Sequence, residues 1–210
     1  MTFSVHGFIV DKEDWREYDR TFTLYTKEYG KIVVLAQGVR KINSKLCGNL
    51  EPLSEVVCMI ARGRSINRIA SVEMRDRFLV IKEQLEKCAI AFFFFDVINQ
   101  LIKEDMRDDA LFRLLQDFFS SLQDAKAGKA YTIGIAALVK LSCILGHQPY
   151  SKGITQSLMR SQSLLAFSRG RTKADYHNLS ARMTAFLENM CDRPLRSKDF
   201  FDFYASGALS

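Results

Sequence analysis

The chain has 210 residues, of which 48% are hydrophobic, and this suffices for one large domain or two small ones with buried cores. It carries 30 Lys and Arg against 24 Asp and Glu, a net charge of +6, which favours polyanionic partners without establishing one. Its five cysteines include no C-x-x-C pair, a pattern that favours a reducing compartment and argues against a disulfide framework.

Short strand-like runs separated by turns occupy the first part of the chain. Alternating polar and apolar residues, or β-branched apolar runs, predict five strands, at residues 3–10, 20–26, 31–36, 53–61 and 66–73. The link between the third and fourth strands is the longest one. Five short strands in this arrangement predict a small closed barrel. The oligonucleotide-binding (OB) fold is the natural candidate, although the spacing also allows an SH3-like barrel.

The pattern becomes helical after Arg77. Apolar stripes at helical spacing predict helices at residues 78–103, 110–123, 130–146, 155–168, 177–190 and 197–206. The first of these is apolar on most faces, which places it at the centre of a helix bundle. We therefore expect an α+β protein, with an N-terminal five-stranded OB-fold barrel at residues 1–77 and an all-helical domain at residues 78–210.

The sequence gives little support for a membrane protein or an enzyme. It opens with no basic stretch followed by a long apolar run, and the apolar run "CAIAFFFFDVI" is too short to span a bilayer, so we expect a cytoplasmic protein. The three histidines have no cysteine or carboxylate at metal-ligand spacing, and there is no glycine-rich phosphate loop or nucleophile elbow. The sequence thus predicts no catalytic residue, no bound metal and no cofactor.

Basic residues of the barrel region gather in and beside its loops. The segment after the third strand, "GVRKINSKLCGNL", holds three cations, and no acid occurs before Glu51. The turn "RGRS" adds two arginines, and another follows on the fifth strand. Such side chains contact DNA phosphates without reading base identity, so we expect DNA contacts from Lys31, Arg40, Lys41, Lys45, Arg62, Arg64 and Arg68. The opposing interpretation is that any exposed loop is polar and often basic, and charge alone does not separate the two.

Four aromatic residues of the same region are candidates for stacking on bases, namely Phe8, Phe22, Tyr25 and Tyr29. Aromatic residues in short strands more often belong to the hydrophobic core. Both interpretations stay open at the level of the sequence.

Three segments resemble the bacterial recombination mediator family RecO in their order and spacing. They are "YDRTFTLYTKEYGKIVVLAQGVRK", "SKLCGNLEPLSEV" and "RGRSINRIASVE", and the late "PLRSKDFF" is similar as well, so that the likeness covers most of the chain. The resemblance implies an N-terminal OB-fold, a helical domain, and binding and annealing of single- and double-stranded DNA. It implies action with RecR and with the C-terminal tail of single-strand-binding protein to load RecA. By position, it assigns DNA contact to Arg40, Lys41 and Lys45, and also to Arg62 and Arg64.

The chain departs from this family at one point of its helical part. Many members carry a four-cysteine zinc site after the position of "ILGHQP", whereas "YSKGITQSLM" follows here and holds no cysteine. The sequence therefore predicts that no zinc is bound.

Two functions from different classes remain open. The first is a non-catalytic, nucleoid-associated mediator that binds and anneals DNA. The second is a protein-interaction adaptor whose OB-like barrel binds no nucleic acid. For the first, the acidic tail of single-strand-binding protein is expected to dock on the basic C-terminal part, which includes Arg160, Arg169, Arg171 and Lys173. The alternative for these cations is that they solvate helix surfaces or contact DNA.

Overall fold

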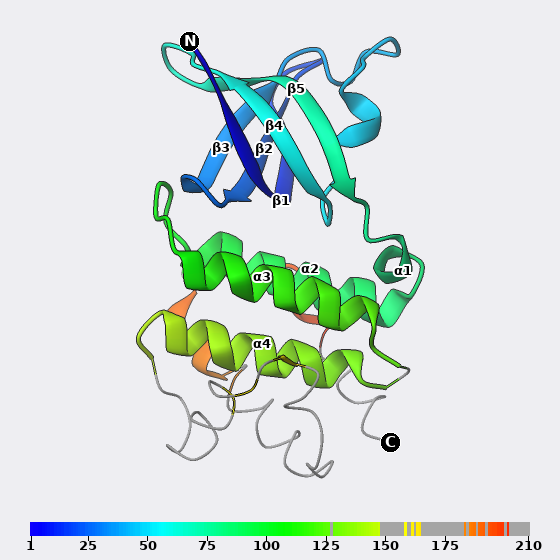
Figure 1. The fold of residues 1–210 in the computed structure, drawn as a ribbon, viewed down its shortest axis with the longest axis vertical. Helices are drawn as coiled ribbons and strands as arrows, with labels where there is room; N and C mark the ends of the chain where they lie inside the picture. The colour runs from blue at the N-terminus through cyan, green and yellow to red at the C-terminus, as the bar shows by residue number, and fades with distance from the viewer. Residues whose placement is uncertain are drawn as a thin grey trace. The chain divides into compact units, whose positions relative to one another are not determined.

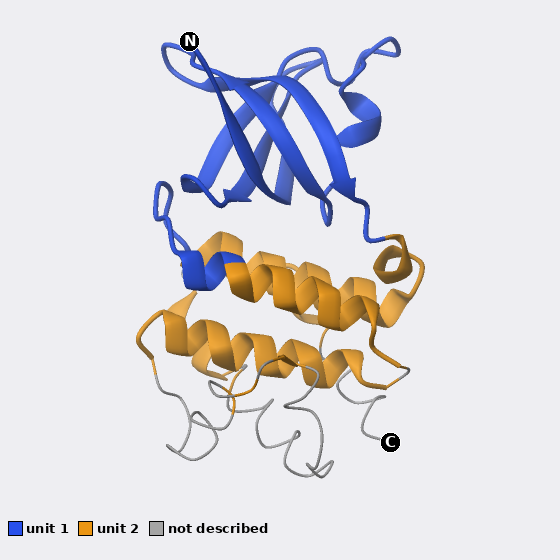
Figure 2. Cartoon of the chain, viewed as in Figure 1, with its two compact units in different colours: residues 1–78, 102–112 blue, residues 79–101, 113–210 orange. Residues whose placement is uncertain are grey.

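The computed structural model describes residues 1–126 and 128–147, together with residues 158, 161, 163–164, 183, 185–187, 189–191, 193–199 and 201. The chain divides into two compact units, coloured separately in Figure 2. The first contains Met1–Phe78 and Ile102–Phe112, and the second contains Leu79–Leu101 and Arg113–Ser210. The predicted domain boundary after Arg77 stays a prediction, because a compact unit is not a test of independent folding.

Five strands form a closed barrel in the first unit (Figure 1). They are β1 (Thr2–Asp14), β2 (Arg20–Thr26), β3 (Gly30–Ala36), β4 (Glu55–Ala61) and β5 (Asn67–Asp76), with the 3₁₀ turn η1 (Cys47–Asn49) between β3 and β4. The order around the barrel is β1-β2-β3-β5-β4, and β4 returns to β1. All neighbours are antiparallel except β3 and β5, which meet in parallel over a short stretch.

The long strand β1 pairs with two neighbouring strands. Its first part pairs with β4 as far as Phe8 opposite Glu55, and its second part pairs with β2 as far as Asp14 opposite Arg20. A register irregularity between Ile9 and Asp11 bends the strand where it passes from one neighbour to the other. Alternate side chains then point into the barrel, where they form a core with Val39 and Leu50 of the β3–β4 loop. The strands contribute to this core Val5, Ile9, Phe22, Leu24, Ile32, Val34, Val56, Cys58, Ile60 and Ile69.

Residues 102–108 belong to the first unit and cover part of the barrel's outer surface. The Lys31 carbonyl accepts a hydrogen bond from the Asp105 amide at 2.9 Å, and the Lys31 Nζ donates to the Ile102 carbonyl at 3.0 Å. The Tyr25 hydroxyl donates to the Asp108 carbonyl at 3.2 Å. Strand β5 pairs with β3 only at Val34 and Leu35, so the start of β3 would have an open edge. Residues 102–108 bond to this part of β3 and protect it.

The second unit is helical in the part that the structure describes. Its helices are α1 (Leu79–Lys82), α2 (Leu85–Leu101), α3 (Asp109–Gln123), of which the first four residues belong to the other unit, and α4 (Ala130–Ile144). The Phe94 ring lies 4.3 Å from that of Phe118 on α3. On the α4 side, a Cβ at Gly134 would lie 2.6 Å from the Ile90 side chain. Since α2 contacts both neighbours, nearly all of its faces are buried, as its apolar sequence predicts.

The predicted fold class is confirmed, since a five-stranded barrel is followed by helices. Strand β4 begins at Glu55 because Leu53 adopts a φ of 56°, which is incompatible with a strand. The predicted helix 78–103 is divided into α1 and α2, because the Gln84 amide donates to Ile81 in a tight turn. The predicted helices at 155–168, 177–190 and 197–206 lie largely outside the described residues.

Candidate nucleic-acid interface

The basic segment after β3 is anchored to the β1–β2 loop, residues 15–19. Gly38 adopts a φ of 64°, a left-handed conformation that glycine tolerates best, and its amide donates to Asp19 Oδ1 at 2.7 Å. The Arg40 amide donates to the Tyr18 carbonyl at 3.1 Å. These two bonds join loops that are about 20 residues apart in sequence and fix where the cations of residues 40–45 emerge.

The charge around this segment is mixed in space, although the segment itself holds no acid. Arg40 Nη1 lies 3.2 Å from Asp14 Oδ2, and Arg20 Nε lies 2.6 Å from Asp14 Oδ1. The hydrogen bond from Arg20, with smaller contributions from Arg40 and Lys12, lowers the pKa of Asp14 below its usual value. Arg40 is thus engaged with a carboxylate, which reduces the positive charge it offers to a phosphate.

Lys41 and Lys45 are the more available cations of the segment. Both side chains are exposed, and Lys41 Nζ lies over the Tyr18 ring at 5.5 Å from its centroid. An exposed cation above an aromatic face remains hydrated on its other side and can still meet an anion. The structure therefore supports Lys41 and Lys45 better than Arg40 as phosphate contacts.

The second predicted group lies at the β4–β5 turn. Arg62, Arg64 and Arg68 are exposed, and Arg68 stands opposite Leu35 of β3. The Arg62 guanidinium lies 5.7 Å from the centroid of the Phe3 ring. The backbone amide of Arg62 donates a hydrogen bond to the Met1 carbonyl. All three arginines have surface positions from which they could contact a polyanion.

Lys31 does not join either group. It stands near the start of β3, whereas the basic segment follows the end of this strand. Its ammonium is half-buried and bound to the Ile102 carbonyl, and burial lowers its pKa. We infer that Lys31 holds residues 102–108 on the barrel, and its predicted contact with DNA has no geometric support.

Three of the four aromatic candidates belong to buried positions. Phe8, Phe22 and Tyr25 are at most 1% exposed, so they offer no ring face to a base. Phe22 lies in the barrel core, whereas Phe8 packs against Phe112 of the same unit. Tyr29 is 40% exposed, but its ring packs edge-on against Phe3 at 5.0 Å.

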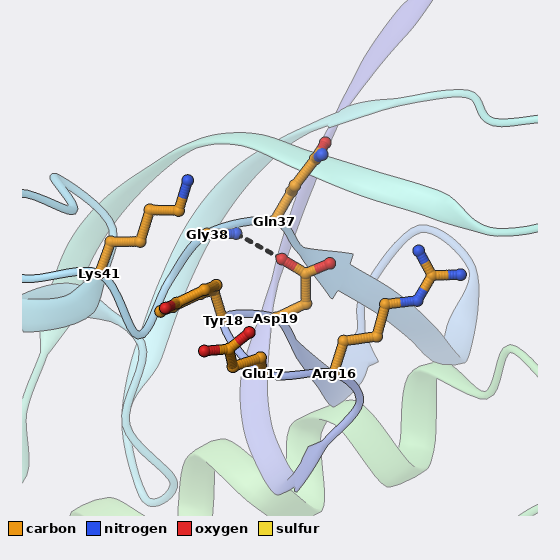
Figure 3. Close-up of a pocket in the computed structure, with 7 residues that line it drawn as sticks. All are labelled: Arg16, Glu17, Tyr18, Asp19, Gln37, Gly38 and Lys41. Atoms are coloured by element: carbon orange, nitrogen blue, oxygen red, sulfur yellow. Dashed lines mark hydrogen bonds between the residues drawn. The ribbon is translucent and has the colours of Figure 1, made fainter.

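Sequence reasoning missed two aromatic residues of the β1–β2 loop, Trp15 and Tyr18. Their side chains are 54% and 46% exposed. The signal was present in "DWREYDR", where two aromatic residues stand among charged residues between two strands. A hollow with a volume of ≈ 270 Å³ lies beside this loop. Figure 3 shows the side chains that line it, namely Arg16, Glu17, Tyr18, Asp19, Gln37, Gly38 and Lys41.

The described residues also bear on the predictions about a metal site, a membrane span and the C-terminal cations. No three of the His, Cys, Asp and Glu residues that the structure describes gather as a metal site. Across the same residues, every helix is too short or too polar to cross a bilayer. Arg160, Arg169, Arg171 and Lys173 lie outside the described part of the chain.

Comparison with known proteins identifies the barrel. Residues 1–78 match the family model "Recombination protein O N terminal". The chain is 27% identical over 147 residues to the DNA repair protein RecO of Pelotomaculum thermopropionicum, a match that covers 70% of this chain and 56% of that protein. It is 34% identical over 122 residues to the RecO of Dehalococcoides mccartyi, covering 58% of this chain and 48% of the relative. The chain thus spans about half the length of these curated relatives. Residues 1–78 are therefore similar to the N-terminal domain of RecO proteins, and the similarity to the curated DNA repair proteins RecO extends beyond this domain.

Proposed function

We propose that this chain is a non-catalytic DNA-binding and strand-annealing mediator of recombinational DNA repair. The observation that carries the proposal is that a barrel matching the RecO N-terminal family presents exposed cations on two of its loops. Lys41 and Lys45 follow β3, Arg62 and Arg64 lie in the β4–β5 turn, and Arg68 stands at the start of β5. The DNA repair names of its relatives support the same function.

Annealing by such a surface needs no bond chemistry. Two complementary strands repel each other through their phosphates, and a basic side chain that contacts a phosphate releases condensed counterions. Cations on mobile side chains can hold two backbones close together without reading their sequence. Base pairing between the strands then supplies the specificity, so the protein contributes only proximity and charge.

The proposed partners follow from the family resemblance. The chain would act with RecR to load RecA on single-stranded DNA in the cytoplasm, at the nucleoid, and would contact the acidic tail of single-strand-binding protein. These partners are tested separately from DNA binding, for instance by titrating a tail peptide against the protein and against a variant with Arg169, Arg171 and Lys173 changed to Glu. Undiminished binding by the variant would exclude this cluster as the docking site.

DNA binding is tested by titrating a labelled oligonucleotide at two salt concentrations. Replacing Lys41 and Lys45 by Ala should weaken binding to all sequences alike and reduce the slope of log K against log salt by about 0.7–0.9 per lost phosphate contact. The matched control is Arg75→Ala, which removes an exposed barrel cation that is already paired with Glu73 at 3.3 Å. This control should leave affinity and slope nearly unchanged.

Two results would contradict the proposal. One is wild-type protein that shows no salt-dependent DNA binding, which would favour the adaptor function. The other is an Arg75→Ala variant that loses as much affinity per cation as the loop variants, because binding would then reflect net charge alone.

A further inference from the structure

The β1–β2 loop presents two aromatic side chains to solvent in a unit that buries most of its rings. Trp15 and Tyr18 are 54% and 46% exposed, whereas Phe8, Phe22 and Tyr25 of the neighbouring strands are at most 1% exposed. A single exposed aromatic residue is ordinary on a protein surface. Two of them stand three positions apart in one short loop, and the exposed cations Arg16 and Lys41 line the hollow beside Tyr18, which gives this loop both stacking and charge capacity.

The loop is held in place by its main chain. The Trp15 amide donates to the Asp19 carbonyl at 3.1 Å, which closes the loop on itself. Asp19 Oδ1 accepts from the Gly38 amide, and the Tyr18 carbonyl accepts from the Arg40 amide, which ties the loop to the segment after β3. A platform that is already ordered loses little further conformational freedom when a ligand binds.

Acidic and basic side chains lie at different positions around Tyr18, so a base and a phosphate would bind at different positions there. Figure 3 shows Arg16 and Lys41 on opposite sides of the group, with Tyr18, Glu17 and Asp19 between them. The two carboxylates repel a phosphate from the middle of the hollow, whereas a nucleobase carries no charge and can stack on a ring. The Lys41 ammonium lies over one face of the Tyr18 ring, 5.5 Å from its centroid, so a base would stack on the opposite face. The flanking cations can contact the phosphates on either side of such a base.

We propose that Trp15 and Tyr18 form a base-stacking platform that receives unpaired bases of single-stranded DNA. This inference rests on the DNA-binding function proposed above and deepens it, because it specifies the strand form that the barrel prefers. Bases in a duplex are stacked on each other and present no free ring face, so the platform would discriminate against duplex DNA. Every base has an aromatic face, so the preference would be independent of sequence.

The test compares three probes of equal length, namely oligo(dT), an oligonucleotide with the same phosphates but abasic sugars, and a duplex. Wild-type protein should bind oligo(dT) about 10-fold or more tightly than the abasic strand. Trp15→Ala with Tyr18→Ala should bring oligo(dT) down to the abasic level without changing the salt slope. The control, Trp15→Phe with Tyr18→Phe, keeps a ring at both positions and should retain most of the preference.

The single tryptophan of the chain provides an independent readout. Trp15 fluorescence should be quenched by oligo(dT), which can stack on the indole, and little changed by the abasic strand at the same degree of saturation. Tyr18→Ala should leave this quenching present but weaken the affinity.

The outcomes separate the platform from the proposed function. Salt-dependent binding of oligo(dT) and abasic strand with equal affinity would overturn the platform and leave DNA binding intact. Absence of binding to all three probes would overturn the proposed function itself. A double alanine variant that keeps the full preference for oligo(dT) would also overturn the platform.

Discussion

Replacing Gly30 by alanine should destabilise the barrel far more than the same change at a comparable glycine. Gly30 adopts a φ of 70°, and a Cβ there would overlap the Met106 backbone carbonyl. The left-handed conformation costs an L residue about 1–2 kcal/mol. Moving residues 102–108 away would also loosen two bonds made by Lys31, at about 1 kcal/mol each. The expected loss in the free energy of unfolding is therefore about 3–4 kcal/mol.

Two other glycines of the same unit supply the controls. Gly38 has a similar φ of 64°, but a Cβ there would meet only the Lys41 side chain, at 3.6 Å. Gly38→Ala should thus cost only the conformational part, about 1–2 kcal/mol. Gly48 has no left-handed φ, and a Cβ there would meet nothing within 4 Å. Gly48→Ala should be neutral or slightly stabilising, because alanine restricts the unfolded chain.

The assay is urea-induced unfolding followed by circular dichroism and by the fluorescence of Trp15, which lies in the barrel unit. Hydrogen exchange of peptides from β2 and β3 would locate the loss in Gly30→Ala. If this variant were no less stable than Gly38→Ala, residues 102–108 would not be packed on β3 as described, and the inferred role of Lys31 would be wrong.

Burial raises the pKa of Cys58 from 9.0 and that of Tyr25 from 10.0, each to about 12. Because each group loses its proton at a lower pH in the unfolded chain, stability should fall from about pH 9 to 12 through Cys58 and from about pH 10 to 12 through Tyr25. The fall should be up to about 1.4 kcal/mol per pH unit for each group within its own window. Alkaline urea titrations of Tyr25→Phe and Cys58→Ala should show a shallower fall than the wild type, and an unchanged pH dependence would refute the assignment. Lys31→Ala should lower the free energy of unfolding by about 1 kcal/mol and leave the salt slope of DNA binding unchanged. Lys45→Ala should reduce the salt slope and leave the free energy of unfolding unchanged. An isolated fragment of residues 1–78 should bind a hydrophobic dye, because Phe8 and Tyr25 lose the cover of residues 102–112; a fragment as dye-free as the full chain would contradict this.

The sequence by itself determined which segments of the described part are strands and which are helices. Period-two alternation in "RTFTLYT" and the apolar run "KIVVLA" are local properties, and they correspond to β2 and β3. The helix at 85–101 is likewise apolar around its circumference and is buried on most faces. Local periodicity suffices here because each element places its own apolar side chains toward the core.

Tertiary structure alone decided which charges and rings are available to a ligand. The acid-free segment after β3 lies beside Asp14, the last residue of β1, and Asp19 of the β1–β2 loop. The charge that a ligand meets there is therefore less positive than the sequence of the segment alone indicates. Tyr25 is buried and bonded to the Asp108 carbonyl of the segment 102–112 in the same unit, whereas Tyr18, seven positions earlier, is exposed. Neither outcome follows from neighbours in sequence, since ion pairing and burial depend on contacts between segments that only folding brings together.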